Sequence, residues 1–144
     1  MQNEQIGFVV KSLNNLIQRQ VESGGEEIRD LTMMQRWIIR YLAERQGKDV
    51  YQKDIERAFT IRRSTATGIL KLMEKKGWIL REAAEGDQRC KKITLTPKAV
   101  HINSVIWQNI LNTEARLSGC LTAEEIRTFL AITEKLIQNL QETV

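Results

Sequence analysis

Histidine, proline and cysteine are scarce in this chain, and their scarcity excludes several kinds of protein. The 144 residues include one histidine, His101, one proline, Pro97, and two cysteines, Cys90 and Cys120. The sequence has no CxxC pair and no histidine cluster, so neither the usual ligand sets for a metal nor a disulfide framework is indicated. A nucleophile elbow and a glycine-rich phosphate loop are also missing. We therefore expect no metal, no cofactor and no enzymatic activity.

Long apolar runs are absent as well. No stretch reaches the roughly 18 apolar residues that a membrane-spanning helix needs. The first residues, "MQNEQIGFVV", lack the basic flank and long apolar core of a secretion signal. With 42% hydrophobic and 28% charged residues, the composition is that of an ordinary globular protein. We expect one domain in the cytoplasm, with no membrane partner.

The positive charge of the chain is concentrated in its middle. The formal net charge is only +4, yet the stretch from Tyr51 to Thr96 holds 11 Lys and Arg against 6 Asp and Glu. The remainder of the chain is therefore close to neutral. A basic excess confined to one segment is typical of a surface that binds an acidic polymer such as nucleic acid.

Helical patterns occupy the first third of the chain. Apolar residues recur at three- and four-residue steps from Ile6 to Val21, which predicts a helix that ends at the "SGG" of residues 23–25. The next segment, "LTMMQRWIIRYLAERQG", begins with Thr32 and has Gln35 three residues later, the spacing of a capping box. We expect this second helix to continue to Gly47.

Two helices and a hairpin are predicted in the basic middle. The segment "DVYQKDIERAFTI" predicts a short helix with Ile55, Ala58 and Phe59 on one face. In "RRSTATGILKLMEKKG" the apolar residues face one way and the small polar and basic ones the other, and Gly77 follows as a terminator. β-branched and aromatic residues then predict a hairpin over residues 78–96, with "EGDQRCKK" at its tip.

Two long helices are predicted after the hairpin. Thr96 followed by Pro97 is an N-cap with proline at the first helical position, and an apolar stripe continues toward Gly119. The last segment opens with a second capping box, Thr122 with Glu125. These helices, like the first one, carry apolar stripes that a core of about 45 residues in the middle of the chain cannot cover, which favours a dimer.

A short helix, a tight turn, a second helix with a small polar leading face and a basic hairpin together predict a winged helix-turn-helix. Each part alone is weak evidence, because hydroxyls at a helix start are often only caps and lysine runs are often only solvated. The combination predicts that the second helix enters the major groove of duplex DNA. Its candidate contact residues are Arg62, Arg63, Ser64, Thr65, Thr67, Gly68, Lys71 and Lys75.

On the motifs "LTMMQRWII", "YQKDIERAFTIRRSTATGILKLMEKKGWILRE" and "DQRCKKITLTPKA", the sequence resembles the MarR family of dimeric winged-helix transcription regulators. The resemblance implies a mainly α (α+β) fold over residues 1–144, a DNA-binding part at 31–96 and dimerisation helices at 1–22 and 97–144. It also implies that the hairpin is a wing that reaches the minor groove and that Asp87 braces Arg89. The candidate wing residues are Asp87, Arg89, Lys91 and Lys92.

The resemblance further implies a homodimer on a pseudo-palindromic operator, most often as a repressor, with a small aromatic or other small-molecule effector. Trp37, Tyr41 and His101 are candidate ligand contacts, although core packing is the commoner role for such aromatic residues. Two alternatives remain open at this point. Cys90 could make the wing redox-sensitive, because neighbouring cations favour a thiolate. The fold could also bind protein rather than DNA.

Overall fold

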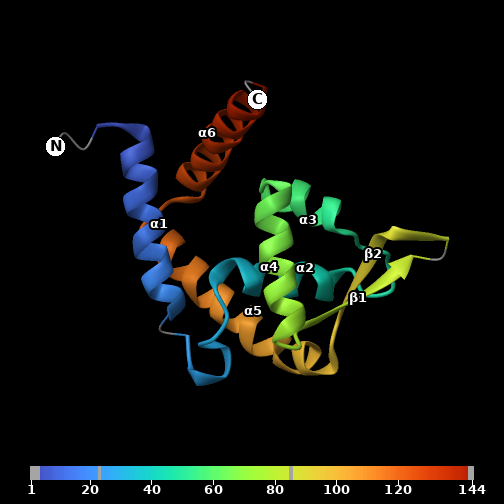
Figure 1. Cartoon of the computed structure of the whole chain (residues 1–144). Helices are drawn as coiled ribbons and strands as arrows, with labels where there is room; N and C mark the ends of the chain where they lie inside the picture. The colour runs from blue at the N-terminus through green and yellow to red at the C-terminus, as the bar shows by residue number, and fades with distance from the viewer. Residues whose placement is uncertain (1–3, 23, 85, 143–144) are drawn as a thin grey trace. The chain divides into compact units, whose positions relative to one another are not determined.

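The structure, a computed structural model, describes residues 4–22, 24–84 and 86–142, without the side chains of residues 84, 87–89 and 142. Its elements in chain order are α1 (Ile6–Glu22), the 3-10 turn η1 (Glu26–Ile28), α2 (Met33–Glu44), α3 (Gln52–Phe59), α4 (Arg63–Lys75), β1 (Ile79–Ala84), β2 (Asp87–Leu95), α5 (Pro97–Ser118) and α6 (Ala123–Glu142) (Figure 1). The described part is therefore mainly helical with one hairpin, as the sequence predicts.

The predicted helix starts are confirmed by their capping hydrogen bonds. The Thr32 hydroxyl accepts from the Gln35 backbone N–H at 3.2 Å, and the Gln35 side chain accepts from the Thr32 N–H at 3.0 Å. Thr122 and Glu125 form the same reciprocal pair at the start of α6, at 3.1 and 2.9 Å. These bonds satisfy backbone donors that a helix start would otherwise leave unpaired.

One predicted helix end is wrong by three residues. The second helix, α2, ends at Glu44 rather than at Gly47, because the Arg45 N–H bonds to the Leu42 carbonyl at 3.1 Å and tightens the last turn. Gly47 instead lies in the following turn with a φ of 86°. The left-handed conformation that favours glycine is thus present, but one turn beyond the helix.

The chain divides into two compact units, residues 1–109 and 110–144, so α5 contributes to both. The core of the first unit contains fully buried aliphatic side chains from α2, α3, α4, the hairpin and α5: Ile38, Ile39, Ile55, Leu70, Met73, Ile79, Ile93 and Ile106. Of the three residues predicted to share the inner face of α3, Ile55 is buried and Phe59 half-buried, whereas Ala58 is exposed. The prediction that Ala58 lies on the buried face of α3 is therefore wrong.

The base of the hairpin is bonded to the segment that precedes α3. The strands β1 and β2 are antiparallel, with Ile79 opposite Leu95 and Arg81 opposite Ile93, and the register is irregular between Ala83 and Ala84. The Ile93 N–H donates to the Val50 carbonyl at 2.8 Å, which joins β2 to the segment before α3. This bond fixes the base of the hairpin beside the start of α3, within the first unit.

The second unit consists of the end of α5 and α6, and it exposes much apolar surface. Phe129, Leu130, Ile132, Ile137 and Leu140 on α6 are all exposed. Among the described residues, no helix combines the length and apolar character that crossing a membrane requires.

Candidate nucleic-acid interface

A tight turn separates α3 from α4 and sets where α4 begins. Thr60 adopts a left-handed conformation with a φ of 55°, and the Ile61 N–H bonds back to the Glu56 carbonyl at 3.1 Å, which ends α3. Arg62 then has the extended backbone of an N-cap, without a side-chain cap, and the helix begins at Arg63. Of the predicted contact residues, Arg62 therefore precedes the helix while the rest lie within it.

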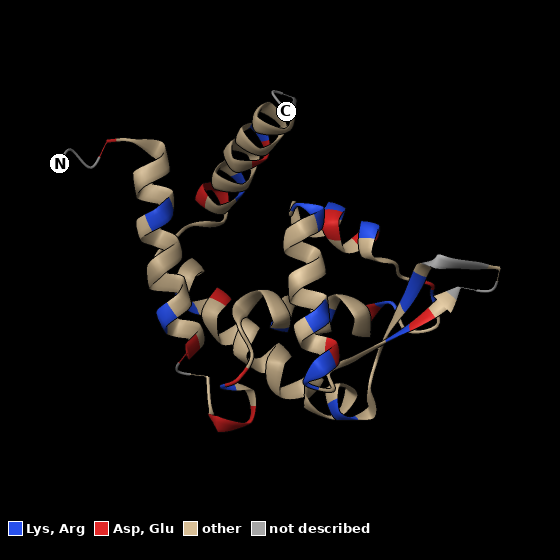
Figure 2. Cartoon of the chain, viewed as in Figure 1, with Lys and Arg blue, Asp and Glu red and all other residues tan. Residues whose placement is uncertain are grey.

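All eight predicted contact residues of this segment are exposed, whereas Ala66, Leu70 and Met73 of the same helix are buried. Figure 2 shows basic residues near both ends of α4 and on α3. Gly68 lies between these basic ends, and a Cβ added there would meet nothing within 4 Å. The outer stripe of α4 thus presents cations, hydroxyls and bare backbone, which suits phosphates and base edges.

Gln52 holds the start of α4 against α3, a contact that the sequence analysis missed. Its side-chain amide donates to the Thr67 hydroxyl at 2.9 Å and lies 3.3 Å from the Arg63 carbonyl. The Thr67 hydroxyl in turn donates to the Arg63 carbonyl at 2.8 Å. A glutamine at the first position of a short helix, 15 residues before a threonine, gives no sequence signal for this pairing.

An ion pair links α4 to the hairpin. Arg81 of β1 donates to Glu74 of α4 at 3.0 Å, and this hydrogen bond holds the pKa of the Glu74 carboxyl below its ordinary value. The sequence analysis assigned no role to either residue. Alternation along β1 was the available signal, because it places Arg81 on the same face of the strand as the buried Ile79.

The structure describes the side chains of two of the four predicted wing residues, Lys91 and Lys92. Lys91 is exposed. Lys92 forms an ion pair with Asp49 at 3.0 Å, and this contact raises the pKa of the Lys92 ammonium. The side chains of Asp87 and Arg89 lie outside the described residues, so their predicted pairing stays a prediction.

A cleft of about 460 Å³ lies between α3, α4 and the hairpin. Lys53, Arg63, Arg81 and Lys91 line it together with the exposed Cys90. Glu56 also lines the cleft and Arg81 is paired with Glu74, but the cations still exceed the carboxylates, which leaves a positive potential at the face where α4 exposes its polar stripe. This cleft extends the basic surface from α4 to the hairpin.

The three candidate ligand residues differ in their burial and in the contacts of their side chains. The Tyr41 ring packs edge-on against Phe59 with 5.7 Å between the centroids, and the Arg45 guanidinium lies 3.6 Å from the centroid of the Tyr41 ring. Trp37 is half-buried and His101 is exposed. The contacts of Tyr41 are packing contacts, and ligand binding by the three residues stays a prediction.

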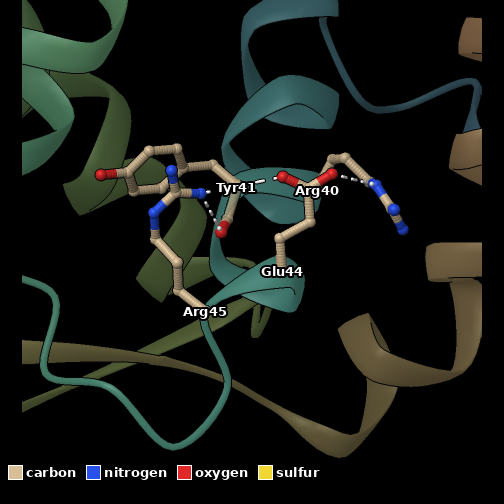
Figure 3. Close-up of polar contacts among 4 residues, drawn as sticks. All are labelled: Arg40, Tyr41, Glu44 and Arg45. Carbon is tan, nitrogen blue, oxygen red and sulfur yellow. Dashed lines mark hydrogen bonds and ion pairs between the residues drawn. The ribbon is translucent and has the colours of Figure 1, made fainter.

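Arg45 lies over the Tyr41 ring, and Arg40 and Glu44 pair with each other beside it near the end of α2 (Figure 3). Arg40 bonds to Glu44 at 3.0 Å, and its guanidinium lies 4.1 Å from the centroid of the Trp107 ring. Arg45 also donates to the Tyr41 carbonyl at 3.2 Å. The end of α2 is thus stabilised by stacked arginines, which contribute roughly 0.5–1 kcal/mol each at partly exposed sites.

Comparisons with known proteins agree with this architecture. A model of the MarR family matches residues 29–89. The transcription regulator MarR from Oenococcus oeni PSU-1 is 30% identical, with 93% of this chain and 99% of that chain covered and a TM-score of 0.78. The winged helix-turn-helix with terminal helices, predicted from the sequence, is confirmed by this likeness.

Two further solved structures share the fold. MepR from S. aureus, in a complex with DNA, is 22% identical, covers 94% of this chain and 98% of its own, and has a TM-score of 0.84. The heme sensor protein PefR from Streptococcus agalactiae, in complex with heme, is 25% identical, covers 96% and 95%, and has a TM-score of 0.67. The same architecture thus occurs in a DNA-bound protein and in a heme-bound one.

Proposed function

The chain belongs to the MarR family of DNA-binding transcription regulators, and from this premise we propose that it represses transcription as a homodimer on a pseudo-palindromic operator. Members of this family are regulators and not enzymes. The observation that carries the proposal is the exposed stripe of α4, where arginine, hydroxyl groups and lysine lie opposite a buried apolar face. A helix of this kind after a tight turn fits the major groove.

In this proposal the two ends of α4 have different roles. Arg63, Ser64 and Thr67 near the N-terminus of the helix contact base edges, because a recognition helix reads bases with its first turns. Lys71 and Lys75 are farther along and contact phosphates, which adds affinity without reading sequence. The wing, with Lys91 and Arg89, contacts the adjacent minor groove.

The homodimer is supported by apolar surface on the terminal helices. On α1, Ile6, Val9, Val10, Leu13 and Leu16 are exposed, and α6 exposes five large apolar residues of its own. Stripes of this extent on two helices exceed what a monomer ordinarily leaves in water. In a two-fold dimer the recognition helices address half-sites about 34–36 Å apart.

A small ligand would act on this spacing. We propose that an effector binds near Trp37, Tyr41 or His101 and favours a dimer geometry in which the two α4 helices no longer fit successive major grooves. A ligand shifts this equilibrium only as far as its affinities for the two geometries differ. An aromatic effector would suit the aromatic side chains of α2.

A redox response through Cys90 is a second candidate, favoured by one observation. Cys90 is exposed on β2 and lines the basic cleft with Arg81 and Lys91. Oxidation of a thiol at this place would alter the interface itself. If peroxide weakens DNA binding by the wild-type protein and by Cys90→Ser equally, this candidate is excluded.

Footprinting on the DNA upstream of the chain's own gene tests the proposed function. We expect protection of two half-sites related by a two-fold axis, and an affinity that falls with salt at a log-log slope of about −0.9 per phosphate contacted. Sedimentation of the free protein should show a dimer. A single protected half-site bound by a monomer, or an affinity independent of salt, would contradict the proposal.

A further inference from the structure

The hydroxyls of two neighbouring threonines on α4 are in different states. The Thr67 hydroxyl donates its hydrogen to the Arg63 carbonyl at 2.8 Å and accepts from the Gln52 amide at 2.9 Å. Within the described ranges, the Thr65 hydroxyl has no hydrogen-bond partner, although both residues are exposed. A free hydroxyl can donate to a base, whereas one whose hydrogen is committed cannot.

The two hydrogen bonds of the Thr67 hydroxyl limit the contacts that this side chain can make with DNA. A hydroxyl has one hydrogen and two lone pairs, and in Thr67 the hydrogen and one lone pair are engaged. What remains on this exposed side chain is one lone pair, which can only accept, and the Cγ2 methyl group. Thr67 also lies one turn after Arg63 on the outer stripe of the helix, so this methyl belongs to the surface that we assign to the major groove.

We propose that Thr67 reads sequence with its methyl group, against the C5-methyl of a thymine, and that Gln52 is the positioning residue that keeps it in this orientation. Thymine is the only base that presents a methyl group in the major groove, and a threonine methyl is a suitable apolar partner for it. This proposal rests on the placement of α4 in the major groove and adds the chemistry of one base contact.

Gln52 makes the orientation a property of the free protein. A threonine in a helix often bonds to the carbonyl four residues earlier, but alone that bond leaves the side chain able to rotate. Here the amide comes from α3 and contacts both the Thr67 hydroxyl and the Arg63 carbonyl, at 2.9 and 3.3 Å. Rotation of Thr67 toward a base as a donor would therefore break bonds to two helices.

The test begins with the wild-type protein and a randomised duplex library, from which the preferred operator is selected. Each thymine of that operator is then replaced in turn by deoxyuridine, which lacks only the methyl group. We expect one position per half-site at which the methyl-free duplex binds about fourfold more weakly, the effect of one buried methyl group. Thr67→Val, which keeps a methyl group there, should retain this discrimination, and Thr67→Ser should lose it.

Three further variants separate the possible outcomes. Thr65→Val makes the same chemical change at a free hydroxyl and should leave the thymine discrimination intact. Gln52→Met removes the amide while keeping a similar length, and should change the base preference at the same position while lowering the melting temperature only slightly, because both lost bonds are exposed. Arg63→Ala should weaken binding overall, because it removes a groove-facing cation.

Three results would overturn the proposal. If Thr67→Ser keeps the thymine discrimination, a group other than the Thr67 methyl contacts the thymine methyl. If no thymine methyl matters to any variant at position 67 while Arg63→Ala still weakens binding, α4 is in the groove but Thr67 does not read a methyl. Unchanged binding by Arg63→Ala would instead remove the placement of α4 on which the proposal rests.

Discussion

The Arg36 guanidinium donates a hydrogen bond to the Asn109 side-chain oxygen at 2.7 Å, which joins the first part of α2 to α5. Arg36 is only 2% exposed, and its other donors bond to three backbone carbonyls, those of Val21, Ile28 and Leu31, at 2.7 to 3.0 Å. Burial lowers the pKa of the Arg36 guanidinium, but an arginine remains charged at neutral pH.

The Arg36 side chain caps backbone carbonyls at the ends of two helical segments. Val21 is in the last turn of α1, where carbonyls have no partner within the helix, and Ile28 ends the following 3-10 turn. One side chain thus satisfies acceptors from α1, from the turn before α2 and from α5. Within the described ranges no carboxylate pairs with it, so its charge is balanced by carbonyl dipoles.

Replacement of Arg36 by methionine should destabilise the protein by roughly 2–4 kcal/mol, because buried acceptors then have no donor. Urea unfolding at a fixed protein concentration measures this, since the stability of a dimer depends on concentration. Arg40→Met, one turn along the same helix, is the control and should cost less than about 1 kcal/mol. Equal losses for the two variants would show that the buried bonds of Arg36 contribute little.

Gly24→Ala should be destabilising by about 1–3 kcal/mol, the usual effect of overpacking a close contact. A Cβ at position 24 would collide with the Asn109 amide and lie 3.1 Å from the Arg36 guanidinium. Gly7→Ala on α1 is the control, because a Cβ there meets nothing within 4 Å and alanine favours helix. Thermal unfolding of the two variants should therefore shift in opposite directions, and a neutral Gly24→Ala would disprove the close approach.

Glu74→Gln should lower stability at neutral pH but have less effect in acid. The Arg81 hydrogen bond lowers the pKa of Glu74 in the folded state, so its contribution is complete above the unfolded pKa of about 4.3 and is lost as the pH falls through the lowered folded value. Because the Glu74 side chain is 38% exposed, we expect less than about 1 kcal/mol.

Unfolding of the wild type and of Glu74→Gln at pH 7 and pH 3 gives the measurement. The exposed Glu114 of α5 supplies a matched control, because Glu114→Gln changes the same group without an arginine partner in the described part of the chain. A difference between wild type and Glu74→Gln that grows on acidification would have the wrong sign for a lowered pKa.

Asp87→Ala should weaken DNA binding even though it makes the wing more positive. The reason is the proposed role of Asp87 in presenting Arg89 to the minor groove. Glu82→Ala on β1 removes one negative charge without that role, so it should leave binding unchanged or strengthen it slightly. The affinities of both variants for the selected operator are measured at one salt concentration. Tighter binding by Asp87→Ala would show that Asp87 affects DNA binding only through its negative charge.

Local physics made much of the fold predictable. The capping boxes at Thr32 and Thr122 involve residues three apart, and the hairpin follows from a change of periodicity after Gly77, so neighbouring residues carry the information. The exposed stripe of α4 was predictable for the same reason, because helical spacing separates it from the buried Ala66 and Leu70.

The sequence by itself determined the order and type of the elements, the family resemblance and the face of α4 that is exposed. Only the tertiary structure decided which distant partners meet: Arg36 with Asn109, 73 residues apart, Gln52 with Thr67, and Glu74 with Arg81. Arg36 lies three residues before the buried Ile39, which placed it on an inner face but named no partner. Such pairings depend on how helices pack, and a single sequence contains no periodic signal for contacts between elements.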